Sequence, residues 1–106
     1  METTSTAKFN VGQVIHHKLF DYRGIIVDID PQFQQSEQWY QMLAKTNPPK
    51  DKPWYHVLVD DTDYITYVAE QNLEEDEEKT PINHPDLYRF FEEVSEGIYR
   101  RKDKKN

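Results

Sequence analysis

The chain has 106 residues, no cysteine, a net charge of −7 and a sequence pI of about 5.0. This length suggests one domain, and the lack of cysteine excludes disulfide and thiolate chemistry. No apolar run approaches the roughly 20 residues that span a bilayer, and the first ten residues lack the basic and apolar regions of a secretory signal. We therefore expect a soluble, intracellular protein.

The charge is unevenly distributed along the chain. Residues 1–60 hold six basic and seven acidic residues, whereas residues 61–106 hold seven basic and thirteen acidic residues. Mean hydropathy is low, at −0.98, yet aromatic residues make up 13% of the chain. This combination favours a small aromatic-rich core with polar appendages over a disordered chain.

Two short strands are expected in the first third of the chain. Val14–His17 is the first, with alternate side chains on opposite faces, and Gly24–Asp30 is the second. Pro31 ends the second strand because proline cannot continue the ladder. On that strand we expect the side chains of Ile25, Val27 and Ile29 to line the core, and those of Asp28 and Asp30 to face outward.

The connection that follows, from Gln32 to Lys52, is long for a small domain and should hold an element of its own. Ser36 can cap a helical turn from about Glu37 to Lys45, which the prolines at 48 and 49 then end.

The strongest strand pattern is Trp54–Val59, with large apolar side chains on both faces. Such a strand lies at the centre of a sheet and is covered on both sides. The acidic turn at 60–63 leads into a second strand, Tyr64–Val68, so the two should form a hairpin. A last short element is expected from Ala69 to Leu73, with Leu73 packed inward.

The C-terminal third is predicted to hold an amphipathic helix near residues 84–98. Asn83 and Pro85 suit a helix start, and Gly97 with the basic residues after it suits an end. The apolar stripe at helical spacing consists of Leu87, Phe90, Phe91, Val94 and Ile98.

Together these elements predict a mostly β fold, a small, partly open SH3-like barrel with a C-terminal amphipathic helix. Periodicity alone leaves a plain β-meander nearly as consistent. The expected organisation is a flexible N-terminus at 1–8, a barrel domain at 9–75, and an acidic linker, helix and basic tail at 76–106.

Catalytic and metal chemistry have little support. His16 and His17 point to opposite faces of a strand, and His56 and His84 have no paired ligand at useful spacing. The acidic residues at 28, 30 and 60–63 are explained by turns and exposed faces. The chain has only three glycines, with no phosphate-cradling loop and no nucleophile elbow. We expect no enzyme activity, no cofactor and no metal.

The aromatic residues indicate a binding surface, because a domain this small cannot bury all of them. The candidate partner surface comprises Tyr22, Arg23, Trp54, Tyr55, His56 and Tyr67. The candidate nucleic-acid contacts are Lys18, Arg23, Lys50 and Lys52.

Four ordered stretches resemble the HspQ family, also called the YccV-like or hemimethylated-DNA-binding domain. They are Lys8-Phe9-x-Val11-Gly12-Gln13 with His17, Tyr22-x-Gly24 to Pro31, Pro53 to Leu58, and Thr66-Tyr67-Val68-Ala69-Glu70-x-Asn72-Leu73. The resemblance covers about residues 8–75. It implies an SH3-like barrel in a small, cytoplasmic, heat-inducible bacterial protein, and makes a homo-oligomer plausible.

The resemblance implies two activities, action with the ATP-dependent protease Lon in protein quality control and binding of hemimethylated DNA. The preferred prediction is a non-enzymatic modulator of Lon-type proteolysis that binds the protease or its client proteins. DNA binding ranks second, because duplex binders need a basic face and this chain is acidic. We expect weak, salt-sensitive DNA binding at most, and no membrane association.

Overall fold

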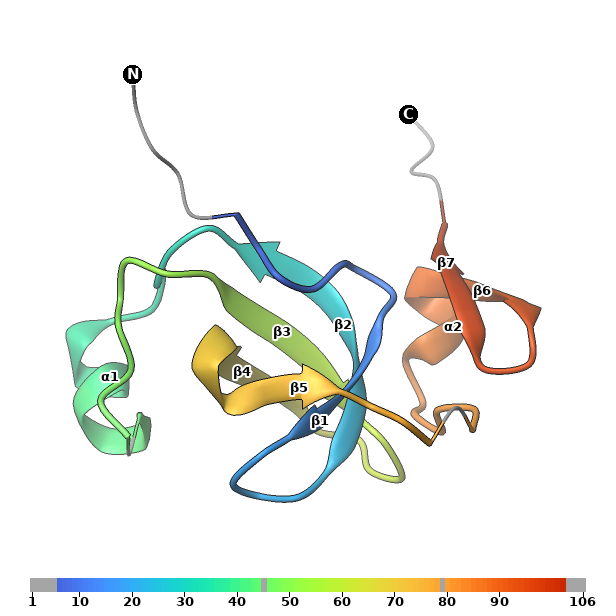
Figure 1. Cartoon of the computed structure of the whole chain (residues 1–106), viewed down its shortest axis with the longest axis horizontal. Coiled ribbons are helices and arrows are strands. Elements are labelled where there is room, and N and C mark those ends of the chain that lie inside the picture. The colour runs from blue at the N-terminus through green and yellow to red at the C-terminus, as the bar shows by residue number, and fades with distance from the viewer. Residues whose placement is uncertain (1–5, 45, 79, 103–106) are drawn as a thin grey trace.

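A computed structural model describes residues 6–44, 46–78 and 80–102, and these residues are mostly β (Figure 1). Within them, five strands form one sheet and two form a separate hairpin. The strands are β1 (Val14–His17), β2 (Arg23–Asp30), β3 (Trp54–Val59), β4 (Ile65–Ala69), β5 (Leu73–Glu75), β6 (Phe91–Ser95) and β7 (Ile98–Arg101). The helices are α1 (Glu37–Leu43), α2 (Leu87–Phe90) and a 3-10 turn, η1 (Glu70–Asn72).

The sheet is antiparallel throughout, with strand order β4-β3-β2-β1-β5. It is not closed into a barrel, because β4 and β5 remain its two edges. In Figure 1 the helix α1 lies beyond one end of the sheet, and the β6–β7 hairpin lies beyond the other. The open edge along β4 is where the candidate site forms.

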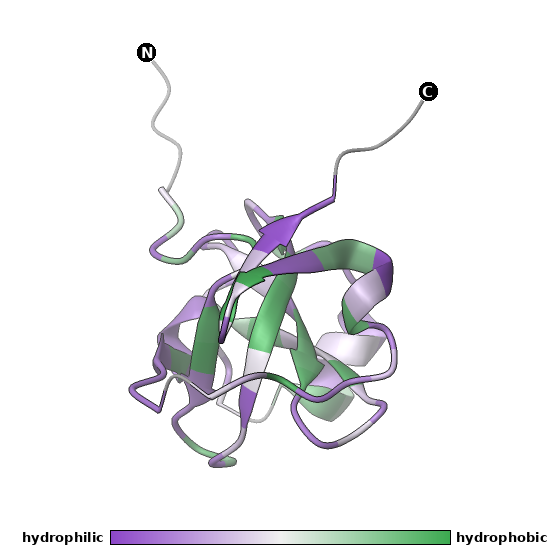
Figure 2. Ribbon diagram, turned by 90° about the vertical axis from the view of Figure 1, so that its right-hand side faces the viewer, coloured by the Kyte–Doolittle hydropathy of each residue, from purple (hydrophilic) through white to green (hydrophobic). Residues whose placement is uncertain are grey.

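The predicted central strand and its hairpin are confirmed. β3 pairs with β2 on one side and β4 on the other, and five of its six residues are buried. Because β3 carries apolar side chains on both faces, it contributes to two cores. Figure 2 shows the apolar residues concentrated along the central strands.

The two cores lie on opposite faces of the sheet. The first joins strands of the sheet to the N-terminal segment, and the second joins the sheet to the C-terminal hairpin. The first contains Phe9, Ile15, Ile26, Tyr55, Val57, Val68 and Leu73. The second contains Ile25, Val27, Leu58, Ile82, Leu87, Phe91 and Tyr99.

Strand β2 differs from the simple alternation predicted for it. A bulge between Ile26 and Asp28 shifts the register, so Ile29 packs with the first core while Ile25 and Val27 belong to the second. A bulge removes a main-chain group from the ladder. The carbonyl of Val27 instead accepts a hydrogen bond from Arg101 Nη1, at 2.7 Å.

The long connection does contain the predicted helix, which runs from Glu37 to Leu43. Ser36 Oγ accepts a hydrogen bond from the main-chain nitrogen of Trp39 at 3.0 Å, as expected for an N-cap. Lys45, where the helix was expected to end, lies outside the described residues. The expected element at 69–73 is also present, as η1 and the start of β5.

The predicted C-terminal helix is wrong beyond its first turn. Only Leu87–Phe90 is helical, and Phe91–Ser95 and Ile98–Arg101 form a hairpin around the Glu96-Gly97 turn. Gly97 has a φ of 76°, in the left-handed region where glycine is favoured. The apolar stripe therefore divides, with Leu87 and Phe91 buried but Val94 and Ile98 exposed.

The N-terminal segment at 6–9 is attached to the sheet. Ala7 packs against the first core, and the main-chain nitrogen of Lys8 donates to Glu70 Oε1 at 3.0 Å. Glu70 also accepts a hydrogen bond from the hydroxyl of Tyr55 at 2.5 Å. Residues 1–5 of the predicted flexible terminus, and Lys104 and Lys105 of the predicted basic tail, lie outside the described residues.

Candidate functional site: an apolar groove beside the open edge of the sheet

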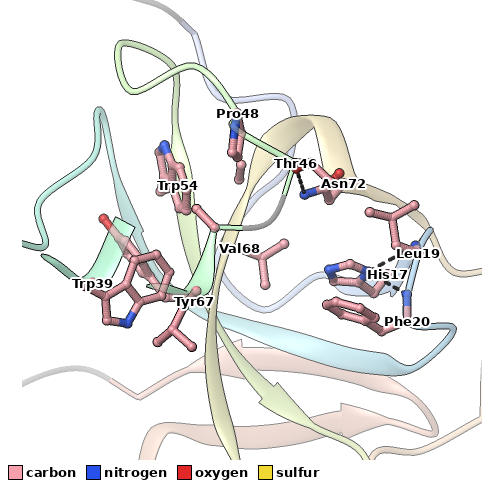
Figure 3. A pocket seen from close by; sticks show the side chains of 13 residues that line it. His17, Leu19, Phe20, Trp39, Thr46, Pro48, Trp54, Tyr67, Val68 and Asn72 are labelled. Atoms are coloured by element: carbon pink, nitrogen blue, oxygen red, sulfur yellow. Dashed lines mark hydrogen bonds between the residues drawn. The ribbon is translucent and has the colours of Figure 1, made fainter. Parts of the chain in front are cut away.

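Two adjoining hollows lie between β4, α1 and the loop that joins β1 to β2 (Figure 3). Their volumes are about 60 Å³ and about 340 Å³. They share the side chains of His17, Phe20, Trp39, Leu43, Tyr67 and Val68. We call this continuous feature the β4 groove.

One wall of the β4 groove is a cluster of aromatic rings. Trp54 stacks on Tyr67 with ring centroids 5.2 Å apart, and Trp39 meets both rings edge-on at 6.0 Å and 5.5 Å. Phe33 packs behind them, 4.9 Å from Trp54. These contacts hold the α1 excursion against β3 and β4, so the wall forms only when the excursion folds onto the sheet.

Hydrogen bonds fix the orientation of Tyr67 within this wall. Its hydroxyl donates to Asp30 Oδ2 at 2.7 Å and accepts from the main-chain nitrogen of Gln34 at 3.0 Å. Burial, and then the hydrogen bond to Asp30, raise the pKa of Tyr67 well above its usual value of 10.0. The phenol therefore stays neutral and donates across the physiological pH range.

The opposite wall comes from His17 and the loop after it. His17 is only 3% exposed, and its Nδ1 accepts from the main-chain nitrogens of Leu19 and Phe20, each at 3.1 Å. Its ring stacks on that of Phe20, with centroids 4.8 Å apart. Burial, and then the charge of His16, lower the pKa of His17, so its ring is neutral at pH 7 and can accept these bonds.

Side chains of β4, together with Tyr22 just before β2, line the groove between these walls. In Figure 3 Val68 lies between the aromatic cluster and His17. Beside it the hydroxyls of Tyr22 and Thr66 are hydrogen-bonded at 2.7 Å. This bond joins β4 to the residue before β2 across the open side of the sheet.

The groove is bordered by apolar side chains that remain accessible. Leu19, Phe20, Leu43 and Ile65 are between 52% and 66% exposed, although each is a large hydrophobic residue. They line the hollows from three different elements. Accessible apolar side chains gathered around a concavity indicate a binding surface, whereas scattered ones do not.

The candidate partner residues fall into two groups. Tyr22, Trp54 and Tyr67 line the groove. Tyr55 is fully buried in the first core, and Arg23 is nearly enclosed by ion pairs. His56 lies behind Tyr67, with ring centroids 4.7 Å apart.

The candidate nucleic-acid contacts are not brought together. Arg23 binds Asp60 Oδ2 and Asp76 Oδ2, at 3.0 Å and 3.1 Å, and Lys50 pairs with Glu37 while lying over the ring of Tyr40. Lys18 and Lys52 are exposed and sit on different loops. No shared basic face therefore arises from these four residues.

The expectation that His56 lacks a paired ligand is wrong. Its Nε2 lies 3.2 Å from Asp30 Oδ2, and one ligand atom each from Asp28, Asp30 and His56 lie within 4.8 Å of one another. These three could coordinate a divalent cation. The hydrogen bonds from His56 and Tyr67 to Asp30 already account for the arrangement, so we assign no metal site.

Sequence reasoning missed the contribution of Leu19, Phe20 and Leu43. The available signal was the Leu19-Phe20 pair, two large apolar residues in an otherwise polar connection. A lone apolar pair in the sequence does not show which surface its side chains will line. Their position in the groove depends on the neutral ring of His17 and on α1, and neither contact can be read from the pair itself.

A second histidine, His16, should make the fold sensitive to pH. His16 bridges Asp21 (2.6 Å) and Glu74 (2.7 Å), and these hydrogen bonds raise its pKa above the usual 6.5. Because the pKa is higher in the folded state, the charged ring stabilises the fold below pH 6.5, and the contribution fades as pH rises through the folded-state pKa. His16→Gln should therefore cost on the order of 1 kcal/mol at pH 6 and much less at pH 9.

Urea denaturation at the two pH values measures this difference. The D21N/E74Q variant keeps His16 but removes its carboxylate partners. It should therefore lose the same pH-dependent part of the free energy of unfolding as His16→Gln does. An equal loss of stability at pH 6 and pH 9 in His16→Gln would show that the side chain acts by packing alone.

The chain folds into a small, mostly β domain with an apolar groove beside an open sheet edge. None of the helices described above has the length and apolarity to cross a membrane. The family model described as hemimethylated DNA-binding protein YccV-like matches residues 7–98. The chain therefore belongs to the YccV-like family, and the match includes the sheet, α1 and most of the C-terminal hairpin.

Proposed function

We propose that this protein is a non-enzymatic accessory factor that modulates ATP-dependent, Lon-type proteolysis by binding proteins. Its setting is protein quality control under heat stress in a bacterial cytoplasm, as the family resemblance implies. The observation that carries the proposal is the β4 groove. Among the lining residues that the structure describes there is no Asp, Glu, Lys or Arg, and four of them are accessible large apolar side chains.

The strand arrangement supports an SH3-like topology for the sheet. Consecutive strands β1 to β4 pair in order, η1 follows β4, and β5 returns to pair with β1. Small sheets of this kind place binding residues on the loops and at the open edges that a rigid scaffold holds in place. The position of the groove at the β4 edge agrees with such a role.

A purified Lon-type protease with an unfolded protein substrate tests the proposal. Addition of the protein should change the initial degradation rate, and Phe20→Ser should remove most of that change because Phe20 is exposed and lines the groove. Tyr88→Ser is the matched control, since Tyr88 is also exposed, at 56%, but lies on α2. Identical rates with and without the protein would contradict the proposal.

DNA binding is the second candidate, favoured by the description of the family itself. Against it stand the net charge of −7 and the engagement of Arg23 and Lys50 in ion pairs. Binding isotherms on hemimethylated and fully methylated duplexes from about 50 to 200 mM salt decide the ranking. Tight binding at the upper salt with a clear hemimethylated preference would make DNA the primary partner.

A further inference from the structure

The β4 groove runs along a strand whose outer main-chain groups are free. The main-chain nitrogen of Val59 donates to the carbonyl of Tyr64, and that of Glu70 donates to the carbonyl of Pro53. In an antiparallel pair such bonded positions alternate, so Ile65 and Tyr67 direct their N–H and C=O groups away from β3. Within the described ranges these outward groups have no hydrogen-bond partner.

An unpaired edge with free donors and acceptors is a template for another extended chain. Main-chain pairing of this kind supplies affinity that depends little on sequence, and pockets for alternate side chains supply selectivity. Here the apolar walls, formed by Phe20 on one side and Leu43 and Trp39 on the other, provide those pockets. A segment lying along β4 should therefore be apolar.

The groove opens at one end into a hollow of a different character. Tyr22 lines both the groove and this second hollow, whose volume is about 520 Å³. The second hollow is bordered by four carboxylates, those of Asp21, Asp60, Asp61 and Glu78. Among the lining residues that the structure describes, Arg23 is the one cation, and it pairs with Asp60, with the nearly buried Asp76 and, at 3.7 Å, with Glu78.

The described residues at this end of the groove therefore carry a net negative charge. Asp21 is 87% exposed and pairs with His16, and Glu78 is 65% exposed and pairs with Arg23. The five described carboxylates here, those of Asp21, Asp60, Asp61, Asp76 and Glu78, outnumber these two basic partners. A phosphate backbone would be repelled here, whereas a lysine or arginine would be attracted. The two hollows together specify an apolar stretch next to a basic residue.

We propose that the β4 groove binds an extended protein segment that adds as a strand to β4, apolar along β4 and carrying a lysine or arginine at the Tyr22 end. The proposal rests on the proposed role as a protein-binding factor and names the partner class for that same site. Segments of this composition are buried in folded proteins and become accessible when a protein unfolds.

Isothermal titration calorimetry with synthetic peptides tests strand addition directly, without the protease. The probe is an eight-residue peptide of alternating valine and threonine, with two lysines at one end or the other. The peptide whose lysines lie at the Tyr22 end of the groove should bind. The same peptide with glutamates in place of those lysines should bind about tenfold more weakly at low salt. N-methylation of the alternate peptide amides whose N–H groups point toward β4 should abolish binding, because it removes the donors that pair with an edge strand.

Two variants separate the parts of the site. Phe20→Ser should lower the affinity for the lysine peptide by about tenfold, as expected for loss of a central apolar contact. The D61N/E78Q variant should bind the lysine peptide about threefold more weakly at low salt. It should bind the glutamate peptide no more weakly than the unchanged protein does. Tyr88→Ser should leave both peptides unchanged. Asn at position 61 is compatible with the left-handed backbone there, where φ is 64°.

The outcomes distinguish this inference from the proposed function. If the peptides fail to bind, or bind equally well when N-methylated, strand addition to β4 is wrong even if the protein still alters degradation. If the lysine peptide binds as expected but degradation never changes, the site exists and the protease role is wrong. Equal binding of the lysine and glutamate peptides would show that the groove does not select a basic residue at its Tyr22 end.

Discussion

Replacement of Arg23 with methionine is expected to lower the free energy of unfolding by about 3–5 kcal/mol, the cost of breaking a buried ion pair. Arg23 is held between Asp60 and Asp76, whose side chains are only 12% and 7% exposed. It also donates to the main-chain carbonyls of Thr80 and Pro81. Methionine fills similar space but leaves the two carboxylates close together with no cation between them.

Urea denaturation followed by circular dichroism measures this loss. Arg100→Met is the matched control, because Arg100 pairs with Glu92 on the exposed face of the C-terminal hairpin and is itself 68% exposed. An exposed pair contributes about 0–1 kcal/mol. If both variants lose the same amount of stability, the Arg23 network does not hold Asp76, Thr80 and Pro81 against the sheet.

Phe91→Ala should cost a similar amount, about 3–5 kcal/mol, because it removes a fully buried aromatic ring. Phe91 packs in the second core with Leu87 and Tyr99, where the C-terminal hairpin meets β2 and β3. The variant should therefore loosen the hairpin as well as lower overall stability.

Ile98→Ala distinguishes the hairpin from a helix at the same positions. On a helix Phe91 and Ile98 would share one buried stripe, whereas in the hairpin Ile98 is 57% exposed. The substitution should change stability by less than about 0.5 kcal/mol. A loss comparable to that of Phe91→Ala, measured by the same denaturation, would favour the helix.

The elements that sequence patterns predicted well are those fixed by local chemistry. The Trp54–Val59 strand has β-forming side chains on both faces and an acidic turn after it, and α1 begins at a serine cap. In both cases the residues that decide the structure lie within a few positions of one another. Such signals remain visible without knowledge of the rest of the fold.

The C-terminal error arose because one apolar pattern suits two structures. Leu87, Phe90, Phe91, Val94 and Ile98 fit a helical stripe, but the Glu96-Gly97 turn between Phe91–Ser95 and Ile98–Arg101 equally suits a two-stranded hairpin. Packing decides between them: the hairpin places Phe91 and Tyr99 on β2 and β3, and lets Arg101 reach the free carbonyl of Val27.

The candidate site could be predicted only in part. Tyr22, Trp54 and Tyr67 were identified as aromatic residues in excess of what a small core needs, and all three line the groove. Arg23 was expected at the surface, but its partner Asp76 lies 53 residues away along the chain. A contact of that separation has no local signature, so sequence patterns could not reveal that the charge is already neutralised.

Both tryptophans of the chain, Trp39 and Trp54, stand in the aromatic wall of the groove, edge-on to each other and against Tyr67. The intrinsic fluorescence of this protein is therefore a local signal. Emission will respond to a ligand that displaces water from the wall and to detachment of the α1 excursion from the sheet. Because the hairpin at 91–101 contains no tryptophan, its separate opening would leave the emission spectrum almost unchanged while altering far-ultraviolet dichroism.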